Sequence, residues 1–288
     1  DSNLKAINRR NWRSIDQRMV GRFYKKYKDA FDSFDGFVHS YPPAFAMLFE
    51  PFGKPIVTVT CTRFDFPTFP ANYQWMAEGL RRMSSSGQLT MIANNRLDKF
   101  YNEQFLGIDT EHISSICDYL EPRTGSGDGE FLLWTRGGQK LDSPRISRTF
   151  SIDKKYDRDK IRNKQGVVHL PYNLSIMSAF EHYWQGIPLY FPSLENQKLL
   201  YASGQPGVLG EVLFPRTMLY FEEDLIGLAD WYDNDNFRGV RLFEDVEHLN
   251  EMLENDDHQN ISEQMQAHNI GRLDKTLRQW ETVLQRIS

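Results

Sequence analysis

Residues 169–193 read HLPYNLSIMSAFEHYWQGIPLYFPS. With the preceding residues, the pattern predicts a strand over 167–170, a tight turn at Pro171, a helix over 174–186 and a second strand over 187–193. A strand, a helix and a further strand in this order form the unit from which parallel sheets are built. The segment therefore predicts an α/β fold.

The same alternation runs through the rest of the chain. Apolar runs rich in β-branched residues predict strands, and apolar residues three or four positions apart predict helices. The other predicted strands cover 34–40, 55–62, 89–95, 112–119, 131–135 and 240–245. The other predicted helices cover 12–34, 42–53, 73–83, 96–106, 246–255 and 262–287, with helical turns within 194–230. Short connections between these elements favour open parallel sheets.

The length of the chain predicts two lobes. Its 288 residues exceed one ordinary core, which holds about 100–150 residues. The stretch EPRTGSGDGE (121–130) contains three glycines, one proline and no apolar residue, and is the best linker candidate. We expect a first lobe over 1–122, a second lobe over 123–261 and a closing helix over 262–288 that packs on the first lobe.

The composition excludes several classes of protein. The net charge of −5 argues against nucleic-acid binding, which needs a basic surface. No apolar run is long enough to span a bilayer and no signal peptide opens the chain, so we expect a soluble, cytoplasmic protein. Cys61 and Cys117 lie in apolar runs and are predicted to be buried free thiols. Aromatic residues make up 14% of the chain, which fits either core packing or stacking on sugars.

The predicted helix over 174–186 begins where a ligand could bind. The N-terminus of a helix presents unpaired N–H groups and a partial positive charge, which suit a diphosphate. Asn173 and Ser175 add side-chain donors at this end. Glu181 shares a helix face with Ser178 and could accept hydrogen bonds from two ribose hydroxyls. The alternative is an ordinary capped helix with Glu181 on a solvated face.

The pattern of Ser178, Glu181, Gly186, Ile187 and Pro188 resembles the donor-binding signature of GT-B-type glycosyltransferases. The resemblance implies two Rossmann-like lobes with a cleft between them and a C-terminal helix that crosses back to the first lobe. It also implies that the helix acid holds the ribose of a nucleotide-sugar, UDP being the expected carrier, and that the preceding loop cradles the diphosphate. His169, Tyr172, Asn173, Ser175 and Glu181 are the donor-binding residues expected in this segment.

Two further stretches resemble poorly characterised transferases of algal, bacterial and large-virus glycan pathways. They are FVHSYPPAF with KPIVTVTCTRFDFP, within 37–67, and ADWYD at 229–233. One feature departs from the GT-B pattern, because those enzymes begin with a strand and this chain begins with a polar segment and a helix. Either that strand is missing or the chain is part of a longer, multidomain polypeptide.

Charged residues at predicted strand ends complete the candidate site. Arg136 and Gly137 follow the strand over 131–135, where open α/β sheets bind ligands, and Lys140 is a second cation nearby. The guanidinium of Arg136 suits phosphate oxygens, although a surface arginine in a glycine turn is equally compatible with the pattern.

The first lobe carries the candidates for catalysis and acceptor binding. His39 and Asp65 follow its predicted strands and could act as the base that takes the acceptor proton. Tyr41 and Arg63 would bind the acceptor. The alternative for His39 is a half-buried histidine with satisfied hydrogen bonds. The alternative for Asp65 is an ion pair with Arg63.

The sequence thus predicts a hexosyl- or pentosyltransferase that moves a sugar from a nucleotide-sugar to a glycan, with no metal or cofactor. Three alternatives remain. Asp233 and Asp235 form a D-x-D triplet, which a metal-dependent GT-A transferase would use, although a solvated loop also explains it. A sugar-nucleotide epimerase and a non-catalytic glycan- or nucleotide-binding protein share the expected architecture.

Overall fold

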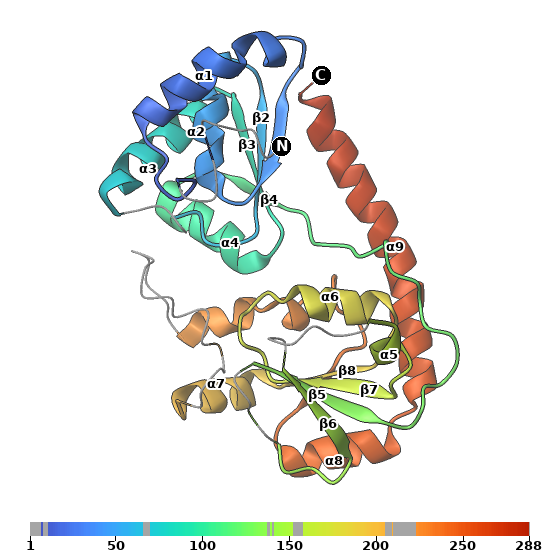
Figure 1. The fold of residues 1–288 in the computed structure, drawn as a ribbon. Helices are drawn as coiled ribbons and strands as arrows, with labels where there is room; N and C mark the ends of the chain where they lie inside the picture. Colours follow the sequence, from blue (N-terminus) through green and yellow to red (C-terminus); the bar gives the residue numbers. More distant parts are fainter. Residues whose placement is uncertain are drawn as a thin grey trace. The chain divides into compact units, whose positions relative to one another are not determined.

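The computed structural model describes residues 7, 11–65, 70–136, 139, 141–151, 158–204, 209 and 223–287. These residues form two compact units, each built on its own parallel sheet (Figure 1). Unit 1 takes in the described residues up to Ser114 together with those from Arg278 onward, and unit 2 takes in those from Ser115 to Leu277. The predicted class, two Rossmann-like α/β units, is confirmed by this architecture.

The sheet of unit 1 has four parallel strands paired in chain order. They are β1 (Phe37–Ser40), β2 (Ile56–Thr60), β3 (Leu89–Ala93) and β4 (Thr110–His112). The two central strands consist largely of β-branched or apolar residues and are almost entirely buried, as expected for a parallel sheet covered on both faces. All four strands therefore end at the same edge of the sheet.

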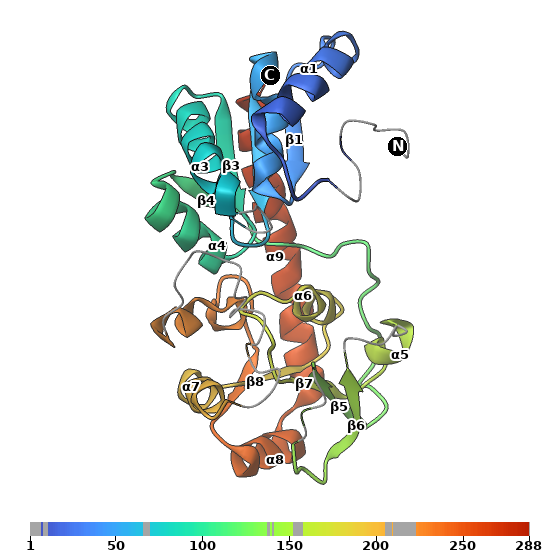
Figure 2. The same ribbon diagram turned by 60° about the vertical axis from the view of Figure 1, so that its left-hand side comes forward.

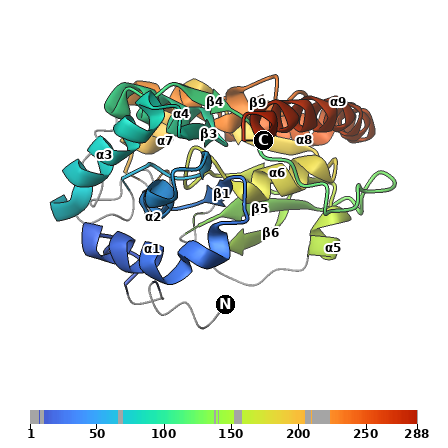
Figure 3. The same ribbon diagram turned by 90° about the horizontal axis from the view of Figure 1, so that it is seen from above.

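Helices connect the strands of unit 1. Figure 3 shows that α1, α2 and α3 lie apart from the C-terminal end of α9. The side chain of Asp16 caps α1 by accepting a hydrogen bond from the Met19 N–H at 2.7 Å. The helices are α1 (Gln17–Phe31), α2 (Ala46–Phe49) between the 3₁₀ turns η1 (Pro43–Phe45) and η2 (Glu50–Phe52), α3 (Pro70–Ser85), and α4 (Arg96–Tyr101) with the π-helical turn η3 (Asn102–Leu106).

Many of the aromatic residues of unit 1 pack on one another. The rings of Phe37 and Phe49 stack with centroids 4.6 Å apart, and Phe23 meets Phe49 edge-on at 5.7 Å. Phe31 and Phe52 join the same group, with centroids 5.6 Å apart. Core packing therefore accounts for this part of the aromatic surplus.

Helix α9 (His258–Gln285) ends on the sheet of unit 1 (Figure 2). Near its C-terminus, Val283 is fully buried in a cluster with Val57, Ile92 and Ile113 from β2, β3 and the residue after β4. In the part of the chain that the structure describes, no helix is both long and apolar enough to cross a bilayer.

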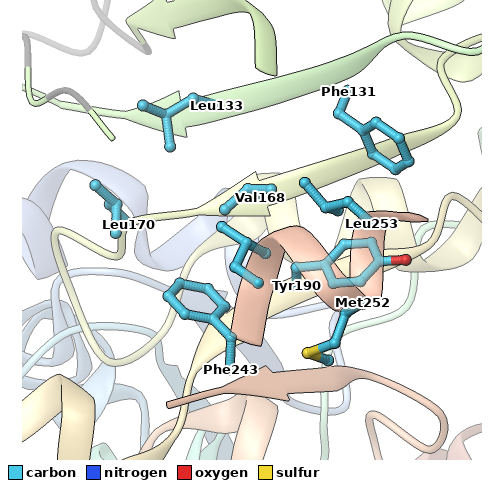
Figure 4. Close-up of a cluster of buried hydrophobic side chains, with 9 residues drawn as sticks. Phe131, Leu133, Val168, Leu170, Tyr190, Phe243, Met252 and Leu253 are labelled. Carbon is cyan, nitrogen blue, oxygen red and sulfur yellow. The ribbon is translucent and has the colours of Figure 1, made fainter. Parts of the chain in front are cut away.

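The sheet of unit 2 has five parallel strands in the order β6-β5-β7-β8-β9. Alternate residues of these strands face α8, and Leu133, Val168 and Tyr190 lie with Leu253 in one buried cluster (Figure 4). The strands are β5 (Phe131–Thr135), β6 (Ile146–Ser151), β7 (Gly166–His169), β8 (Leu189–Pro192) and β9 (Arg241–Phe243). The helices and 3₁₀ turns are α5 (Arg158–Arg162), α6 (Met177–Trp184), α7 (Leu194–Ala202), η4 (Glu223–Leu228), η5 (Asp230–Tyr232) and α8 (Val246–Asn255).

One predicted strand is wrong, and two elements of the structure were not predicted. The strand predicted over 112–119 is wrong, because β4 ends at His112. Of the residues that follow, Ile113 packs in the core of unit 1, whereas Cys117 belongs to unit 2 and is fully buried. Strand β6 and helix α5 were not predicted, because their sequences are largely polar and lack regularly spaced apolar residues. The linker predicted over 121–130 contains no helix or strand and lies within unit 2.

Candidate functional site

Two of the predicted donor-binding residues lie together in unit 2. Arg136 directly follows β5, and Tyr172 lies in the loop after β7, the neighbouring strand. The guanidinium carbon of Arg136 lies 5.2 Å from the centre of the Tyr172 ring, which is a cation–π contact. The loops after these strands therefore meet at the carboxyl edge of the sheet. Gly137 and Lys140 lie outside the described residues.

The start of the helix after β7 differs from the prediction. Helix α6 begins at Met177, not at residue 174, and Ile176 is its N-cap. The side chain of Asn173 accepts a hydrogen bond from the Leu174 N–H at 2.8 Å and does not cap the helix. Leu174 is buried and its carbonyl accepts a hydrogen bond from the Asp230 N–H, which ties the bent loop over 172–175 to the start of η5. Asn173 and Ser175 are half-buried in this loop.

The end of α6 explains the glycine in the sequence motif. Gly186 has φ +72°, a left-handed conformation that ends the helix. Its N–H bonds to the carbonyl of Tyr183, and the N–H of Ile187 bonds to the carbonyl of His182. These two bonds form a Schellman motif. The glycine thus sets the direction in which the chain enters β8.

Glu181 is buried, so the alternative of a solvated glutamate is wrong. Its Oε1 atom accepts a hydrogen bond from the Tyr119 hydroxyl at 2.7 Å and another from Nη2 of Arg158 at 2.7 Å. Burial, followed by the hydrogen bond to this carboxylate, raises the pKa of the Tyr119 hydroxyl. Tyr119 is exposed and the Arg158 side chain is 52% exposed, so a buried acid is held by two surface residues.

His169, predicted to bind the donor, lies in the core of unit 2 with no exposed surface. Its Nε2 atom lies 3.2 Å from Nδ1 of His182, and its ring stacks on Phe191 with centroids 4.6 Å apart. Burial lowers the pKa of His182 to about 4 and that of His169 well below its usual range. Both rings are therefore neutral at pH 7, and in this conformation the His169 ring does not reach the loop surface.

Several buried polar atoms of unit 2 have no hydrogen-bond partner among the described residues, and those of Gln197 were not predicted from the sequence. Gln197, in the first turns of α7, is fully buried, and neither atom of its amide has a hydrogen-bond partner among the described residues. The hydroxyl of Ser178 and the indole N–H of Trp231 are also buried and have no partner there. Buried polar groups are normally paired, so this set requires an explanation. The sequence could have pointed to Gln197 because this glutamine comes soon after the carboxyl end of a buried strand.

In unit 1, His39 is half-buried near the carboxyl end of β1. Its Nε2 atom lies 2.7 Å from the hydroxyl of Thr58, and its buried Nδ1 atom has no partner among the described residues. Burial lowers the pKa of His39 to about 4, so the ring is neutral at pH 7. Tyr41 follows β1 and meets the ring of Trp12 at 5.9 Å, and burial raises the pKa of its hydroxyl.

Arg63 and Asp65 are buried after β2, and Asp98 joins them from α4. The guanidinium carbon of Arg63 lies 5.9 Å from the centre of the Tyr101 ring. Asp98 accepts a hydrogen bond from the Asn95 side chain at 2.6 Å, and the Asn95 side chain accepts one from the Asp98 N–H at 2.8 Å. The sequence analysis missed Asp98, although Asn95 followed three residues later by an acid is a capping pattern.

The electrostatics of this cluster favour a neutral Asp98 in mildly acidic solution. Burial raises the pKa of Asp98 to about 6, although the hydrogen bond from Asn95 and the charge of Arg63 act in the opposite direction. The charge of Asp65 raises it further. The carboxyl edge of unit 1 thus combines one buried cation with two buried acids.

The D-x-D triplet forms a local turn. The Asp233 carboxylate accepts hydrogen bonds from the Asp235 N–H at 3.0 Å and from the Asn236 side chain at 2.7 Å, and Asp235 lies 3.4 Å from the ammonium of Lys275. Across the described ranges, no group of three or more histidine, cysteine or acidic residues could hold a metal ion.

The two cysteines are free, as predicted. Cys117 is buried and Cys61 is half-buried. Burial raises the pKa of each thiol to about 11, so both are protonated at neutral pH. Neither is therefore suited to act as a nucleophile or as a metal ligand.

Known proteins resemble this chain distantly. No protein-family model matches it, and no curated protein matches it. Among solved structures, 94% of the chain superposes on 80% of the glycotransferase of kitacinnamycin, with 10% identity and a TM-score of 0.41. An equal share superposes on 81% of CalG4, the calicheamicin glycosyltransferase, with 11% identity and a TM-score of 0.39. At these values we assign no family to the chain.

Proposed function

We propose that the chain is a glycosyltransferase that moves a sugar from a nucleotide-sugar, UDP-linked, to a hydroxyl of a glycan, without a metal ion. The observation that carries this proposal is the buried carboxylate of Glu181, held by the exposed residues Tyr119 and Arg158. A carboxylate accepts several hydrogen bonds at once, which suits the adjacent hydroxyls of a ribose. Burial makes each such bond stronger than in water.

The other residues at the carboxyl edge of unit 2 support the same ligand. Arg136 would pair with the diphosphate through its fork of donors, beside Tyr172 and the N–H groups at the start of α6. Asn173 and Ser175 lie in the loop between them. These groups would stabilise the departing nucleoside diphosphate, which carries the charge that develops during transfer.

The amide of Gln197 supports a hydroxyl-rich ligand in particular. An amide both donates and accepts, and a sugar hydroxyl needs partners of both kinds. Because neither amide atom has a protein partner within the described chain, a sugar hydroxyl would satisfy a group that is otherwise costly to bury. Gln197 is therefore our candidate for contacting the transferred sugar.

The acceptor would bind at the carboxyl edge of unit 1. The base would take the proton of the acceptor hydroxyl while its oxygen attacks the sugar carbon and the nucleoside diphosphate leaves. His39 and Asp65 are the candidates; burial, which lowers the pKa of His39 to about 4, keeps its ring neutral at pH 7 but also makes it a weak base. Tyr41 and Arg63 would orient the acceptor. His39→Ala and Asp65→Ala separate the two, because loss of the base abolishes turnover but preserves donor binding.

The direct test is a thermal-shift screen with UDP, GDP, CMP and their sugars, with and without Mn²⁺. A ligand at ~100 times its Kd stabilises the fold by about 2.7 kcal/mol. We expect Glu181→Gln to lose this stabilisation, whereas Glu195→Gln, on the exposed surface of α7, keeps it. Circular dichroism would check that both variants fold. Equal ligand affinity in the native chain and in Glu181→Gln would refute the ribose role.

The same screen, extended to product analysis, separates the alternative functions. Loss of activity in EDTA would favour a metal-dependent transferase, for which Asp233 and Asp235 are the candidate ligands. Conversion of the donor without an acceptor would favour an epimerase. Binding without turnover for any acceptor would favour a binding protein.

A further inference from the structure

One oxygen of Glu181 is already saturated by protein donors. The hydroxyl of Tyr119 and Nη2 of Arg158 each lie 2.7 Å from Oε1. A carboxylate oxygen offers two lone-pair positions, so both positions on Oε1 are in use. A ribose that places one hydroxyl on each carboxylate oxygen must therefore displace one of the two residues.

Arg158 is the donor that can leave at the lower cost. Its side chain is half-exposed, so water can solvate the guanidinium after it leaves Glu181. Its guanidinium carbon lies 5.8 Å from the centre of the Tyr119 ring, which offers a second contact. The hydroxyl of Tyr119, by contrast, has an increased pKa and remains a neutral donor.

The charge balance requires Arg158 to find a new anion. When Arg158 leaves, the buried carboxylate of Glu181 loses one positive neighbour, and ribose hydroxyls replace the hydrogen bond but not that charge. Arg158 is the first residue of α5, which follows β6 in the chain, and β6 pairs with the strand that Arg136 follows. A diphosphate bound at this edge would supply the anion, with a geometry that matches the guanidinium fork.

We propose that Arg158 exchanges partners when the donor binds, leaving Glu181 to the ribose and pairing with the diphosphate. This proposal rests on the proposed nucleotide-sugar site. It gives Arg158 two roles: it stabilises the buried acid before binding and holds the phosphates afterwards. A nucleoside without phosphates would displace Arg158 and offer it no new anion. The site would therefore select phosphorylated ligands over free nucleosides.

The test compares UDP with uridine, and GDP with guanosine, by calorimetric titration of the full chain. Arg158→Met retains much of the side-chain length and removes the charge. We expect its Kd for the diphosphate to rise about tenfold or more, because charge-assisted hydrogen bonds are lost. Its Kd for the nucleoside should stay the same or fall, because nothing competes for Glu181. Arg162→Met, on the same helix, is the matched control and should bind both ligands as the native chain does.

The possible results separate the two proposals. Equal weakening of nucleotide and nucleoside in Arg158→Met would mean that Arg158 merely orders Glu181, and unchanged binding of both would place it outside the site. Either result overturns the exchange. Tyr119→Phe keeps the ring and should affect the binding of nucleotide and nucleoside alike. If this variant, and not Arg158→Met, binds the two ligands differently, the exchange is also overturned. If the native chain binds none of the four compounds, the proposed function itself fails.

Discussion

Acid should destabilise unit 2 through the buried histidine pair. His169 and His182 lie 3.2 Å apart in the core, and neither His169 Nδ1 nor His182 Nε2 has a partner among the described residues. Protonating either ring places a charge where no water solvates it. The unfolded chain, in contrast, takes up these protons near pH 6.5. The stabilising effect of the neutral rings is therefore complete above pH 6.5 and is lost as the pH falls.

The magnitude follows from the pKa of His182. This pKa is about 4 in the folded chain, compared with 6.5 when unfolded. Proton linkage then gives a loss of about 2 kcal/mol in the free energy of unfolding between pH 7.5 and pH 5. His169 acts in the same direction. The charge of the neighbouring Glu181 favours the protonated form of His182 and is already included in this pKa.

The assay is urea denaturation of the native chain and of His182→Asn between pH 4.5 and pH 8. Asparagine keeps an amide near the position of Nδ1 but does not titrate. We expect the native chain to lose about 2 kcal/mol more than this variant on going from pH 7.5 to pH 5. Asp98 acts in the opposite direction, because its increased pKa stabilises the folded state in acid. His39 in unit 1 acts in the same direction as the histidine pair, because burial lowers its pKa to about 4. Asp98 and His39 are present in both proteins, so their effects cancel in the comparison. If the free energies of unfolding of the two proteins change in parallel with pH, the role of the histidine pair is refuted.

Two further predictions concern stability. Gly186→Ala should lower the free energy of unfolding by about 1–2 kcal/mol in urea, because φ is +72° and the new Cβ would lie 2.6 Å from the Gln266 side chain. Gly107→Ala, with φ +65° and no atom within 4 Å, should cost less, and an equal or greater loss there would contradict the role of Gln266. Leu133→Ala removes a fully buried side chain and should cost about 2–5 kcal/mol in thermal or urea unfolding. Leu199→Ala, at a position 70% exposed, should change stability by less than about 0.5 kcal/mol, and similar losses for the two would contradict the packing in Figure 4.

Local sequence patterns predicted most of the strands. Ile56–Thr60 and Phe131–Thr135 match the predicted segments closely, because β-branched and apolar runs bounded by turn residues favour strands wherever they occur. Strand β6 was missed because its residues are largely polar and it lies at the edge of its sheet. The predicted start of α6 failed for a related reason. Its cap residue was chosen from local propensity, whereas in the structure the preceding loop is bent and is tied to the distant Asp230 through the Leu174 carbonyl.

The candidate site was predicted in part. The rule that parallel strands bind ligands at their carboxyl ends selected Arg136, and the resemblance of the 169–193 segment selected Tyr172; the structure brings these two into contact. Asp98 and Gln197 were missed, because their types and spacing match ordinary surface helices. Burial without a partner is what distinguishes Gln197, and a sequence does not reveal burial.

The sequence by itself determined the α/β class, the parallel strands and the residue types that follow them, since these depend on neighbours within a few positions. The tertiary structure decided the state of each side chain. Glu181 is buried and bonded because Tyr119, 62 residues earlier, and Arg158, 23 residues earlier, are brought to the same carboxylate. His169 is a core residue because it stacks on Phe191 of the next strand. Charge, protonation and hydrogen bonding depend on such distant neighbours, and only folding brings them together.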